Sequence, residues 1–507
     1  MYHDKFLPNG FTRDTANREL LENVRPPTWR NPRPVDRYTL VVIGAGTAGL
    51  VAAHAAAALG ARVALIERNL VGGDCLNVGC VPSKTLIRTS RLYAEMRNAE
   101  NFGARIPDDI RVDFSVTMAR VRRIRARISR HDSVQRLSSA GVDVYFGEAR
   151  FSGPDRVIVD GQTLHFKKAL IATGARPETP AIPGLEEAGY LTNETVFELT
   201  ELPRRLLVVG GGPLGCELAQ AFRRLGSQVI IVHDAPLFLP REERDAAQIV
   251  SDSFARDGIE IRLNTMAVAA RSEGGQRLVD LVSEDYKSTV TVDQVLTGIG
   301  RRPNVEGMNL EAANVQYDTA TGIRVNDFLQ TDNPRIYAAG DACLEHKFTH
   351  TADASARIVV QNALFLGRKR FSALTIPWCT YTDPEVAHVG LYVRQARDNN
   401  IPVKTFTVPL HDVDRAIADG EEEGFVKIHV REGTDKILGA TVVARHAGEM
   451  INEISLAIVS GMGLRSLARV IHAYPTQANA IKQAADAYNR TRLTPRIKSL
   501  LMRWLTW

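Results

Sequence analysis

The sequence predicts an α/β protein that contains two separate βαβ units. The first unit lies near the N-terminus, and the second begins about 166 residues later in the chain. Each unit has an apolar run of strand length, a glycine-rich turn, a helix-forming stretch and a second apolar run. Strands that alternate with helices at these distances are typical of parallel sheets covered by helices.

Length and composition are those of a globular protein with several domains. The chain has 507 residues, of which 44% are hydrophobic and 24% charged, which excludes disordered, collagen-like and disulfide-scaffold proteins. Five cysteines in a chain of this length indicate a reducing compartment, so we expect a cytoplasmic protein. No apolar run has the length of a membrane span, and the first forty residues lack the apolar core of a signal peptide.

The net charge of +5 is concentrated at the C-terminus. The chain carries 63 basic and 58 acidic side chains, and residues 490–507 contain five basic residues and no acidic one. The rest of the chain is therefore balanced in charge.

The first βαβ unit follows residues 1–37, which hold five prolines and are expected to form an irregular extension. Its strands cover residues 40–43 and 63–66, and its turn contains Gly44, Gly46 and Gly49. Such glycines let the backbone approach a pyrophosphate at the start of the following helix. Glu67, at the end of the second strand, is placed to accept a hydrogen bond from a ribose hydroxyl.

The second βαβ unit repeats this pattern with strands over residues 206–209 and 229–232. Gly210, Gly212 and Gly215 form its turn, and His233 and Asp234 follow its second strand. Two dinucleotide sites in one chain predict two dinucleotides that exchange electrons. An acidic residue after the second strand, with no arginine beside it, favours NADH over NADPH.

A pair of cysteines, Cys75 and Cys80, lies after the first unit. In a regular helix their Cα atoms would be separated by about 7.5 Å of rise and about 140° of rotation, whereas a disulfide needs Cα atoms within about 7 Å. A bridge therefore requires a distorted start of the helix, which Gly79 makes easy. Because so short a loop adds little stability when it is closed, redox chemistry explains the pair better.

At this segment the sequence resembles the FAD-dependent pyridine nucleotide–disulfide oxidoreductases, the family of dihydrolipoamide dehydrogenase, glutathione reductase and mercuric reductase. The resemblance extends from about Tyr38 to Tyr488 and includes the motifs 172–174, 298–304 and 337–341. It implies FAD in the first unit, NAD(P)H in the second and a C-terminal α+β dimerisation domain, and thus a homodimer. The implied domains are an N-terminal extension (1–37), the FAD-binding domain (38–183 and 304–370), the NAD(P)-binding domain (184–303), the dimerisation domain (371–489) and a basic C-terminal helix (490–507).

The resemblance also assigns roles to single residues. Electrons pass from the nicotinamide through the flavin to the Cys75–Cys80 disulfide, with Cys80 against the flavin and Cys75 facing the substrate. Lys84 and Glu217 match the charged pair beside the reducible nitrogen of the flavin. The cofactor-binding residues implied are Gly44, Gly46, Gly49, Glu67, Gly73, Lys84, Glu148, Ala149, Thr173, Gly174, Gly210, Gly212, Gly215, His233, Asp234, Gly300, Gly340 and Asp341.

One departure from the lipoamide and glutathione enzymes concerns the catalytic base. Their His-Pro-Thr motif, followed by a glutamate, is replaced here by Tyr474-Pro475-Thr476, with Asn479 at the glutamate position. A phenol titrates near pH 10 and is a poor base at neutral pH, and His472 lies two residues from the expected position. Mercuric reductases share this tyrosine, because thiolates that bind a soft metal ion have no need of such a base.

The physiological acceptor stays open among three alternatives. Mercuric reductases end in a cysteine pair, which this chain lacks. The sequence therefore predicts an FAD-dependent NAD(P)H oxidoreductase of the mercuric-reductase-like type, with a metal ion or a small disulfide-like compound as acceptor. The alternatives are a dihydrolipoamide dehydrogenase and a membrane-associated flavoprotein that reduces quinone or a protein partner.

The remaining cysteines and the basic clusters have simpler interpretations. Cys216, Cys343 and Cys379 are expected to be core residues, with a third redox thiol at Cys343 as the alternative, and no resident metal site is predicted. Nucleic-acid binding is not expected. After Pro495 an apolar stripe with interspersed basic residues predicts a helix that packs on the dimer or docks on the inner face of a membrane. Six arginines on one predicted helix indicate a solvated face: Arg120, Arg122, Arg123, Arg125, Arg127 and Arg130.

Overall fold

The computed structural model describes residues 11–107, 110–365 and 367–506. It divides into two compact units, one formed by Met1–Asp234 and Ile261–Leu374 and the other by Ala235–Glu260 and Thr375–Trp507. The stretch expected to be the NAD(P)-binding domain, 184–303, is thus shared between the two units.

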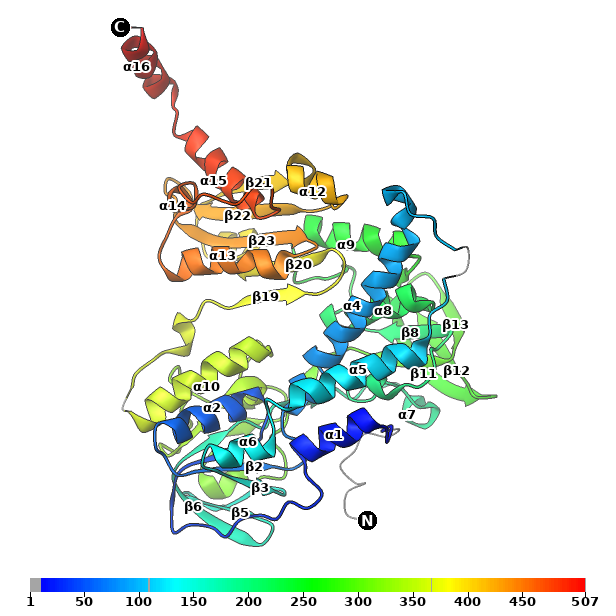
Figure 1. Cartoon of the computed structure of the whole chain (residues 1–507), viewed down its shortest axis with the longest axis vertical. Helices are drawn as coiled ribbons and strands as arrows, with labels where there is room; N and C mark the ends of the chain where they lie inside the picture. Colours follow the sequence, from blue (N-terminus) through cyan, green and yellow to red (C-terminus); the bar gives the residue numbers. More distant parts are fainter. Residues whose placement is uncertain (1–10, 108–109, 366, 507) are drawn as a thin grey trace. The chain divides into compact units, whose positions relative to one another are not determined.

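The first βαβ unit forms the centre of a mixed sheet with the strand order β3-β2-β1-β6-β5-β4, and β18 pairs with β6. Strands β2, β3, β5 and β6 of this sheet are labelled in Figure 1. The parallel strands are β1 (Tyr38–Ile43), β2 (Val63–Glu67), β3 (Val142–Phe146), β6 (Gln162–Ile171) and β18 (Ile336–Ala338). The antiparallel strands β4 (Arg150–Gly153) and β5 (Arg156–Val159) complete the sheet.

Both faces of β1 are buried, as its continuous apolar run requires. Leu40 and Val42 pack into a core with α2 (Thr47–Ala58) and α10 (Thr349–Leu364). Val41 and Ile43 point to the opposite face, where they pack with Val305 and other residues of the same unit. The helices of this unit that follow the first strands are α3 (Gly73–Asn77), α4 (Cys80–Arg97), α5 (Phe114–Ser129) and α6 (Val134–Ser139).

The second βαβ unit forms a smaller sheet in the order β10-β9-β8-β14. Its strands are β8 (Arg205–Val209), β9 (Gln228–Val232), β10 (Glu260–Arg262) and β14 (Gln294–Thr297), and α8 (Pro213–Leu225) follows β8. The residues between β10 and β14 form an antiparallel sheet. Its strands are β11 (Met266–Glu273), β12 (Gln276–Val282) and β13 (Lys287–Val292). Shorter elements are α7 (Leu185–Ala188) and the strand pairs β7 (Ala175–Pro177) with β15 (Arg301–Pro303) and β16 (Tyr317–Asp318) with β17 (Gly322–Ile323).

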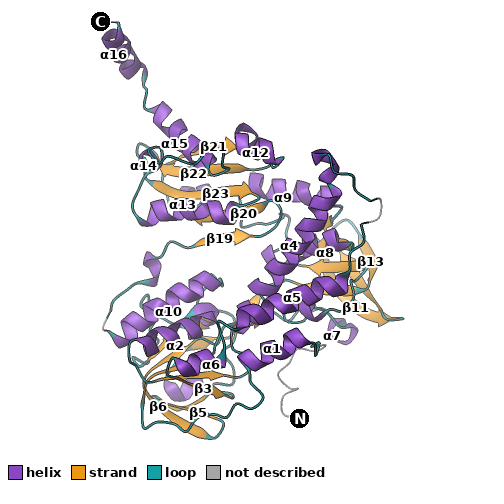
Figure 2. Ribbon diagram, in the orientation of Figure 1, coloured by secondary structure: helices purple, strands orange, loops and turns teal. Residues whose placement is uncertain are grey.

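The other compact unit contains an antiparallel sheet in the order β19-β20-β23-β22-β21 (Figure 2). The helix α13 packs on β20 and β23, and α15 packs on β21 and β22. The strands are β19 (Pro377–Thr380), β20 (Glu385–Gly390), β21 (Val403–Pro409), β22 (Phe425–Arg431) and β23 (Ile437–Ala444). The helices are α9 (Arg244–Asp257), α11 (Val393–Asp398), α12 (Asp414–Asp419), α13 (Ala447–Val459), α14 (Leu464–Leu467), α15 (Asn479–Thr491) and α16 (Pro495–Leu505).

The N-terminal extension differs from its expectation. Residues 1–10 lie outside the described residues, but α1 (Thr15–Val24) is a regular helix rather than irregular chain. Asp14 caps it by accepting a hydrogen bond from the backbone N–H of Asn17, and Leu20 and Val24 are fully buried. The prolines lie outside this helix, before it and after Arg25, so they limit its length without preventing it.

Candidate active site

The two cysteines lie on different helices because the chain breaks between them. Cys75 is in α3, which ends at Asn77, and Cys80 begins α4. Gly79 caps α4 with backbone angles far from helical, φ −126° and ψ −113°. A Cβ at this position would lie 2.9 Å from the backbone oxygen of Asp74. The break lets the two side chains meet, as the predicted distortion requires, and both are thiols in this structure.

The two thiols titrate as an unequal pair. The Cys75 thiol hydrogen-bonds to Cys80, and this bond lowers the pKa of Cys80 to about 6, with further lowering by Thr349 and Lys84. The same bond, followed by burial, raises the pKa of Cys75. The Sγ of Cys80 lies 3.3 Å from the Oγ1 of Thr349, at the start of α10. The pair therefore holds one proton near neutral pH, with the thiolate at Cys80.

Lys84 lies one turn after Cys80 on α4 and forms an ion pair with Glu217 of α8. Its Nζ is 2.8 Å from the Oε2 of Glu217, whose side chain is 5% exposed. Helices α4 and α8 pack on each other, which brings together two residues 133 positions apart. This arrangement places a fixed positive charge on the face of α4 that also carries the thiolate.

The first glycine turn is built for close backbone approach. A Cβ on Gly44 would lie 2.3 Å from the backbone oxygen of Ala172, and one on Gly49 would lie 1.8 Å from the oxygen of Gly44. Gly73 is equally tight, since its Cβ would come within 2.5 Å of the Cα of Gly46. Gly46, by contrast, has no atom within 3.4 Å of such a Cβ, and it caps the start of α2. The open side of the turn is thus at Gly46, where a phosphate would meet the helix N-terminus.

A cavity of about 120 Å³ opens beside this turn. Five of the predicted cofactor-binding residues line it, namely Gly44, Glu67, Glu148, Ala149 and Thr173. Glu67 is buried and accepts hydrogen bonds from the backbone N–H groups of Ala45, at 2.8 Å, and Asn69, at 2.7 Å. Burial raises the pKa of its carboxyl. The wall includes residues that were not predicted to bind the cofactor: Ile43, Ile66, Arg68, Gly147, Asn304, Glu306, Gly307 and Met308. The glycine cradle, the acidic residue and the cavity fit the nucleotide part of FAD.

The predicted cofactor-binding residues that follow β6, β14 and β18 are also held in place by specific contacts or backbone angles. Thr173 and Asn304 exchange two hydrogen bonds, of 2.7 and 2.9 Å. Gly174, Gly300 and Gly340 have positive φ angles of 69°, 134° and 69°, which only glycine adopts readily. Burial raises the pKa of Asp341, whose Oδ2 lies 3.7 Å from the Nε of Arg301.

The second glycine turn repeats the close packing of the first. A Cβ on Gly210 would lie 2.6 Å from the oxygen of Gly298, and one on Gly215 would lie 2.3 Å from the oxygen of Gly210. Gly212 caps α8. The Nδ1 of His233 accepts a hydrogen bond from the backbone of Gly211 and lies 3.5 Å from the Oδ1 of the exposed Asp234. The imidazole thus covers the turn, and Asp234 is the acidic group at its edge.

Tyr474 belongs to the other compact unit. Its side chain is exposed, and its hydroxyl donates a 2.9 Å hydrogen bond to Asp414, which raises the pKa of the phenol. The residue at the glutamate position, Asn479, begins α15. The Nε2 of His472 lies 2.9 Å from the Oε1 of Glu453. The raised pKa keeps Tyr474 protonated at neutral pH, so even less phenolate is present to accept a proton than for a phenol in water.

The three other cysteines have separate surroundings. Cys216 is buried in α8, and burial raises the pKa of its thiol. Burial also raises the pKa of Cys343, whose Sγ donates to the oxygen of Gly340 at 3.7 Å. Cys379 in β19 lies 4.0 Å from a carboxylate oxygen of Glu385.

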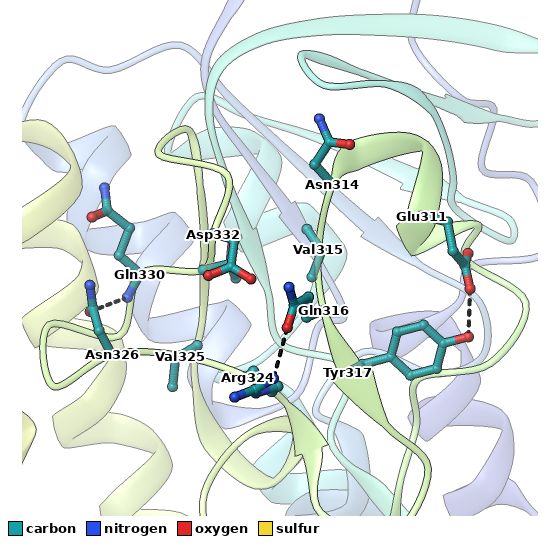
Figure 3. Close-up of a pocket in the computed structure, with 11 residues that line it drawn as sticks. Glu311, Asn314, Val315, Gln316, Tyr317, Arg324, Val325, Asn326, Gln330 and Asp332 are labelled. Carbon is teal, nitrogen blue, oxygen red and sulfur yellow. Dashed lines mark hydrogen bonds between the residues drawn. The ribbon is translucent and has the colours of Figure 1, made fainter.

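A larger surface pocket lies elsewhere in the first compact unit (Figure 3). It has a volume of about 820 Å³ and is lined by polar residues such as Glu311, Tyr317 and Arg324. Arg324 donates to Gln316, and Tyr317 donates to Glu311. None of the predicted site residues lines it.

Two kinds of feature are absent from the described residues. Within residues 11–107, 110–365 and 367–506, no cluster of three or more His, Cys, Asp or Glu side chains has the geometry of a metal site. In the same part of the chain, no helix combines the length and the apolar character needed to cross a membrane.

The arginines of α5 correct one expectation and reveal residues that the sequence did not indicate. Arg125 is only 1% exposed and Arg122 only 8%, so this helix does not present all of its arginines to solvent. Arg125 donates to the backbone oxygen of Asn77, between the two cysteines. Asn193 and Arg301 bind Asp74, next to Cys75, at 2.9 and 3.1 Å. A mid-helix arginine flanked by apolar residues was the one sequence signal for this role.

Two family models match the chain, and together they cover most of it. Residues 38–356 match pyridine nucleotide-disulphide oxidoreductase, and residues 376–485 match the dimerisation domain of the same family. The mercuric reductase of Staphylococcus aureus is 33% identical over 453 residues, which cover 89% of this chain and 83% of that protein. The dihydrolipoyl dehydrogenase of Thermus scotoductus is also 33% identical, over 89% of this chain and 98% of that protein.

Solved structures agree with these relatives. The HOCl-induced flavoprotein disulfide reductase RclA from Escherichia coli matches with a TM-score of 0.80 and 29% identity, over 89% of this chain and 99% of that chain. LpdA from Mycobacterium tuberculosis matches with a TM-score of 0.82 and 30% identity, over 90% of this chain and 100% of that chain. The dimerisation domain indicates a homodimer. The chain belongs to the pyridine nucleotide–disulfide oxidoreductase family, whose members are FAD-dependent oxidoreductases with NAD(P)H as electron donor.

Proposed function

We propose that Cys75 and Cys80 are the redox-active pair and that the protein reduces a soft metal ion or a small disulfide-like compound with electrons from NAD(P)H. The observation that carries this proposal is the break at Gly79, which brings the two thiols together with the Oγ1 of Thr349 3.3 Å from the Sγ of Cys80. The pair is unequal, because its surroundings lower the pKa of Cys80 and raise the pKa of Cys75. FAD, when bound, supplies the two-electron link between NAD(P)H and this pair.

The two cysteines have different tasks toward a disulfide-like acceptor. The Sγ of Cys75 attacks one sulfur of the acceptor to form a mixed disulfide, and its proton passes to the other sulfur, which leaves as a thiol. The Cys80 thiolate then attacks Cys75, which breaks the mixed disulfide and leaves a Cys75–Cys80 disulfide, while the released second sulfur takes a proton from water and becomes a thiol. Two electrons leave the pair, and the acceptor is reduced to two thiols.

A metal ion as acceptor is favoured by the lack of a strong base at Tyr474. The raised pKa of the phenol disfavours proton removal from a substrate thiol at neutral pH. Two thiolates, in contrast, bind a soft ion directly, because metal binding itself displaces the proton of Cys75. A relative, RclA of Escherichia coli, has been solved as a Cu(II) complex, at 28% identity and a TM-score of 0.79.

The acceptor can be identified by NAD(P)H oxidation in the presence of Hg(II), Cu(II), lipoamide, glutathione disulfide and a water-soluble quinone. We expect turnover with a metal ion and slow turnover with lipoamide, both lost in Cys75→Ser. Replacing Tyr474 with His should raise lipoamide turnover and leave metal turnover within about twofold. Brisk lipoamide turnover by the unaltered protein would instead support a dihydrolipoamide dehydrogenase, and turnover with quinone alone would support the membrane flavoprotein. NADH and NADPH are compared in the same assay, and we expect NADH to be preferred because Asp234 repels a 2′-phosphate.

We also propose that α16 docks the enzyme on an anionic membrane surface. Every residue from 490 to 506 is exposed, and this segment lies beyond the matched dimerisation domain, which ends at residue 485. At about 100° per residue, five of the apolar side chains of α16 share an arc of about 140°, with Arg496, Lys498 and Arg503 on its flanks. These five are Ile497, Leu500, Leu501, Trp504 and Leu505, and the exposed Met502 lies outside the arc.

Flotation with vesicles tests this docking directly. We expect binding to phosphatidylglycerol vesicles that weakens with salt and is at least about tenfold tighter than binding to phosphatidylcholine vesicles. Arg496→Gln/Lys498→Gln/Arg503→Gln and Trp504→Ser/Leu500→Ser should both abolish it. A matched control, Arg105→Gln/Arg123→Gln/Arg127→Gln, removes the same charge from exposed positions of the other compact unit and should retain binding. Loss of the dimer after deletion of residues 493–507, without vesicle binding by the full chain, would show that α16 packs on the dimer instead.

A further inference from the structure

Helix α1 packs tightly on the FAD-binding region. Helix α1 lies before residue 38, where the family match begins. It packs on α5, and Leu20 and Val24 join a core with Ala126. The backbone N–H of Val71 donates to the oxygen of Val24 at 3.1 Å. Helix α1 is therefore an integral part of this compact unit.

One polar contact joins α1 to a buried arginine. The Nη2 of Arg125 donates to the Oδ1 of Asn17 at 2.8 Å and to the Oε1 of Glu198 at 2.9 Å. Asn17 is itself fully buried and fixed, because its Nδ2 donates to the oxygen of Thr12 at 2.6 Å and its N–H binds the capping Asp14. Helix α1 thus holds one of the acceptors that orient the guanidinium group.

The same guanidinium group reaches the cysteine segment, defined as residues 73–80. The Nη1 of Arg125 donates to the backbone oxygen of Asn77 at 2.9 Å. Asn77 lies at the end of α3, where backbone oxygens have lost their helical partners. Its side chain ties the segment further by donating to the oxygens of Val71 and Gly73. Asn17, Arg125 and Asn77 therefore form a continuous connection from α1 to the break between the cysteines.

The burial of this group is costly for a contact that would serve stability alone. Arg125 and Glu198 each expose 2% of their side chains. Within the described part of the chain, the Nε of Arg125 and the Oε2 of Glu198 have no hydrogen-bond partner. A buried ion pair with unsatisfied atoms recovers little of its desolvation free energy. Its rigid and planar donors are well suited to fixing a backbone position.

We propose that α1 acts through Asn17 and Arg125 to hold the cysteine segment in the geometry that brings Cys75 and Cys80 together. Asn17 and Arg125 are positioning residues in this arrangement. The inference rests on the proposed redox role of the two cysteines. When the connection is broken, the segment loosens, the two sulfur atoms move apart, and the Cys80 thiolate loses the contacts that stabilise it.

The test measures the long-wavelength thiolate–flavin absorbance of the FAD-loaded protein, reduced anaerobically by one equivalent of NADH, between pH 5 and 9. Asn17→Leu removes the acceptor for Arg125 and keeps the branched shape of the side chain. The matched control is Asn23→Ala, which removes another α1–α5 hydrogen bond, the 2.9 Å bond from Asn23 to Ser129, without touching Arg125. Arg125→Met removes the donor. If the unpaired carboxylate of Glu198 prevents this variant from folding, the double variant Arg125→Met/Glu198→Gln is used in its place.

We expect Asn17→Leu to shift the pH midpoint of this absorbance upward and to lower the absorbance at pH 6.5 at least about threefold, whereas Asn23→Ala matches the unaltered protein. Adding Asn17→Leu to the Arg125 variant should have no further effect, because both changes break the same connection. An unchanged midpoint in Asn17→Leu, an equal shift in Asn23→Ala, or additive effects would each overturn the proposal. No band in the unaltered protein would overturn the proposed redox role and this inference with it, whereas a band with an unchanged midpoint in Asn17→Leu would overturn this inference alone.

Discussion

At the scale of single residues, the chemistry rests on the charge state of Cys80. A thiol in water titrates near pH 8.5, and the hydrogen bond from Cys75, with Thr349 and Lys84, lowers the pKa of Cys80 to about 6. The partner thiol moves in the opposite direction. One hydrogen bond therefore prepares a thiolate at one position and keeps a protonated thiol at the other.

This asymmetry predicts how the reduced protein responds to pH. Thiolate absorbance near 240 nm should persist from pH 8 down to about 6 and decrease below it. Because the pKa in the folded protein is lowered, ionised Cys80 stabilises the folded state, and this contribution is lost as the pH falls from about 8.5 to about 6. Denaturant unfolding of the reduced protein across this range checks the sign. A midpoint near 8.5 in the folded protein would contradict the arrangement.

Replacing Lys84 with Met should raise the pH midpoint of the Cys80 thiolate, since the nearby positive charge is removed. The variant also leaves the buried Glu217 carboxylate without its 2.8 Å partner, so we expect a loss of stability. The double variant Lys84→Met/Glu217→Gln should recover stability but keep the raised midpoint. The half-buried pair Lys482–Asp486 in the other compact unit offers a control, because Lys482→Met should leave the midpoint unchanged.

At the scale of secondary-structure elements, substitutions in the first glycine turn distinguish a glycine needed for folding from a glycine needed for cofactor binding. Gly49→Ala places a Cβ 1.8 Å from the oxygen of Gly44 and should destabilise the unit, whereas the Cβ of Gly46→Ala meets no atom within 3.4 Å. We expect Gly46→Ala to fold but to bind FAD at least about tenfold more weakly, since Gly46 is on the side of the turn open to a phosphate. Flavin absorbance of the purified proteins and their melting temperatures give the two readouts. Full FAD content in Gly46→Ala would contradict this placement.

Helix α1 makes a measurable contribution to stability. Leu20 is fully buried against α5 and the central sheet, so Leu20→Ala should lower the free energy of unfolding by about 2–5 kcal/mol. The exposed Glu22 on the same helix is the control, and Glu22→Ala should change it by less than about 0.5 kcal/mol. Equal effects of the two changes in urea unfolding would show that α1 does not pack as described.

At the scale of the whole molecule, the sequence predicted the repeated βαβ units because glycine turns and apolar strands are local patterns. The break between Cys75 and Cys80 also followed from spacing and Gly79. The buried role of Arg125 did not, because its partners Asn17 and Glu198 lie 108 and 73 residues away, and a charged side chain on a helix is ordinarily solvated. Helix α1 was missed because its ten residues lie between proline-containing stretches and show a short apolar pattern.

The ion pair between Lys84 and Glu217 is likewise a long-range contact that the local sequence does not indicate. Neither residue carries a local signal, and only the resemblance to the family indicated both. The structure supplies the physical reason, since α4, which follows the first βαβ unit, packs on α8 of the second unit. Long-range contacts of this kind depend on topology and are not encoded in the neighbouring sequence.

The central claim is that Cys75 and Cys80 form the redox pair, with the thiolate at Cys80 beside the flavin. Anaerobic reduction by one equivalent of NADH tests it most directly. The account predicts a long-wavelength thiolate–flavin absorbance band in the unaltered protein, retained in Cys75→Ser and absent in Cys80→Ser. No band in the unaltered protein, or a band that survives in Cys80→Ser, would contradict it.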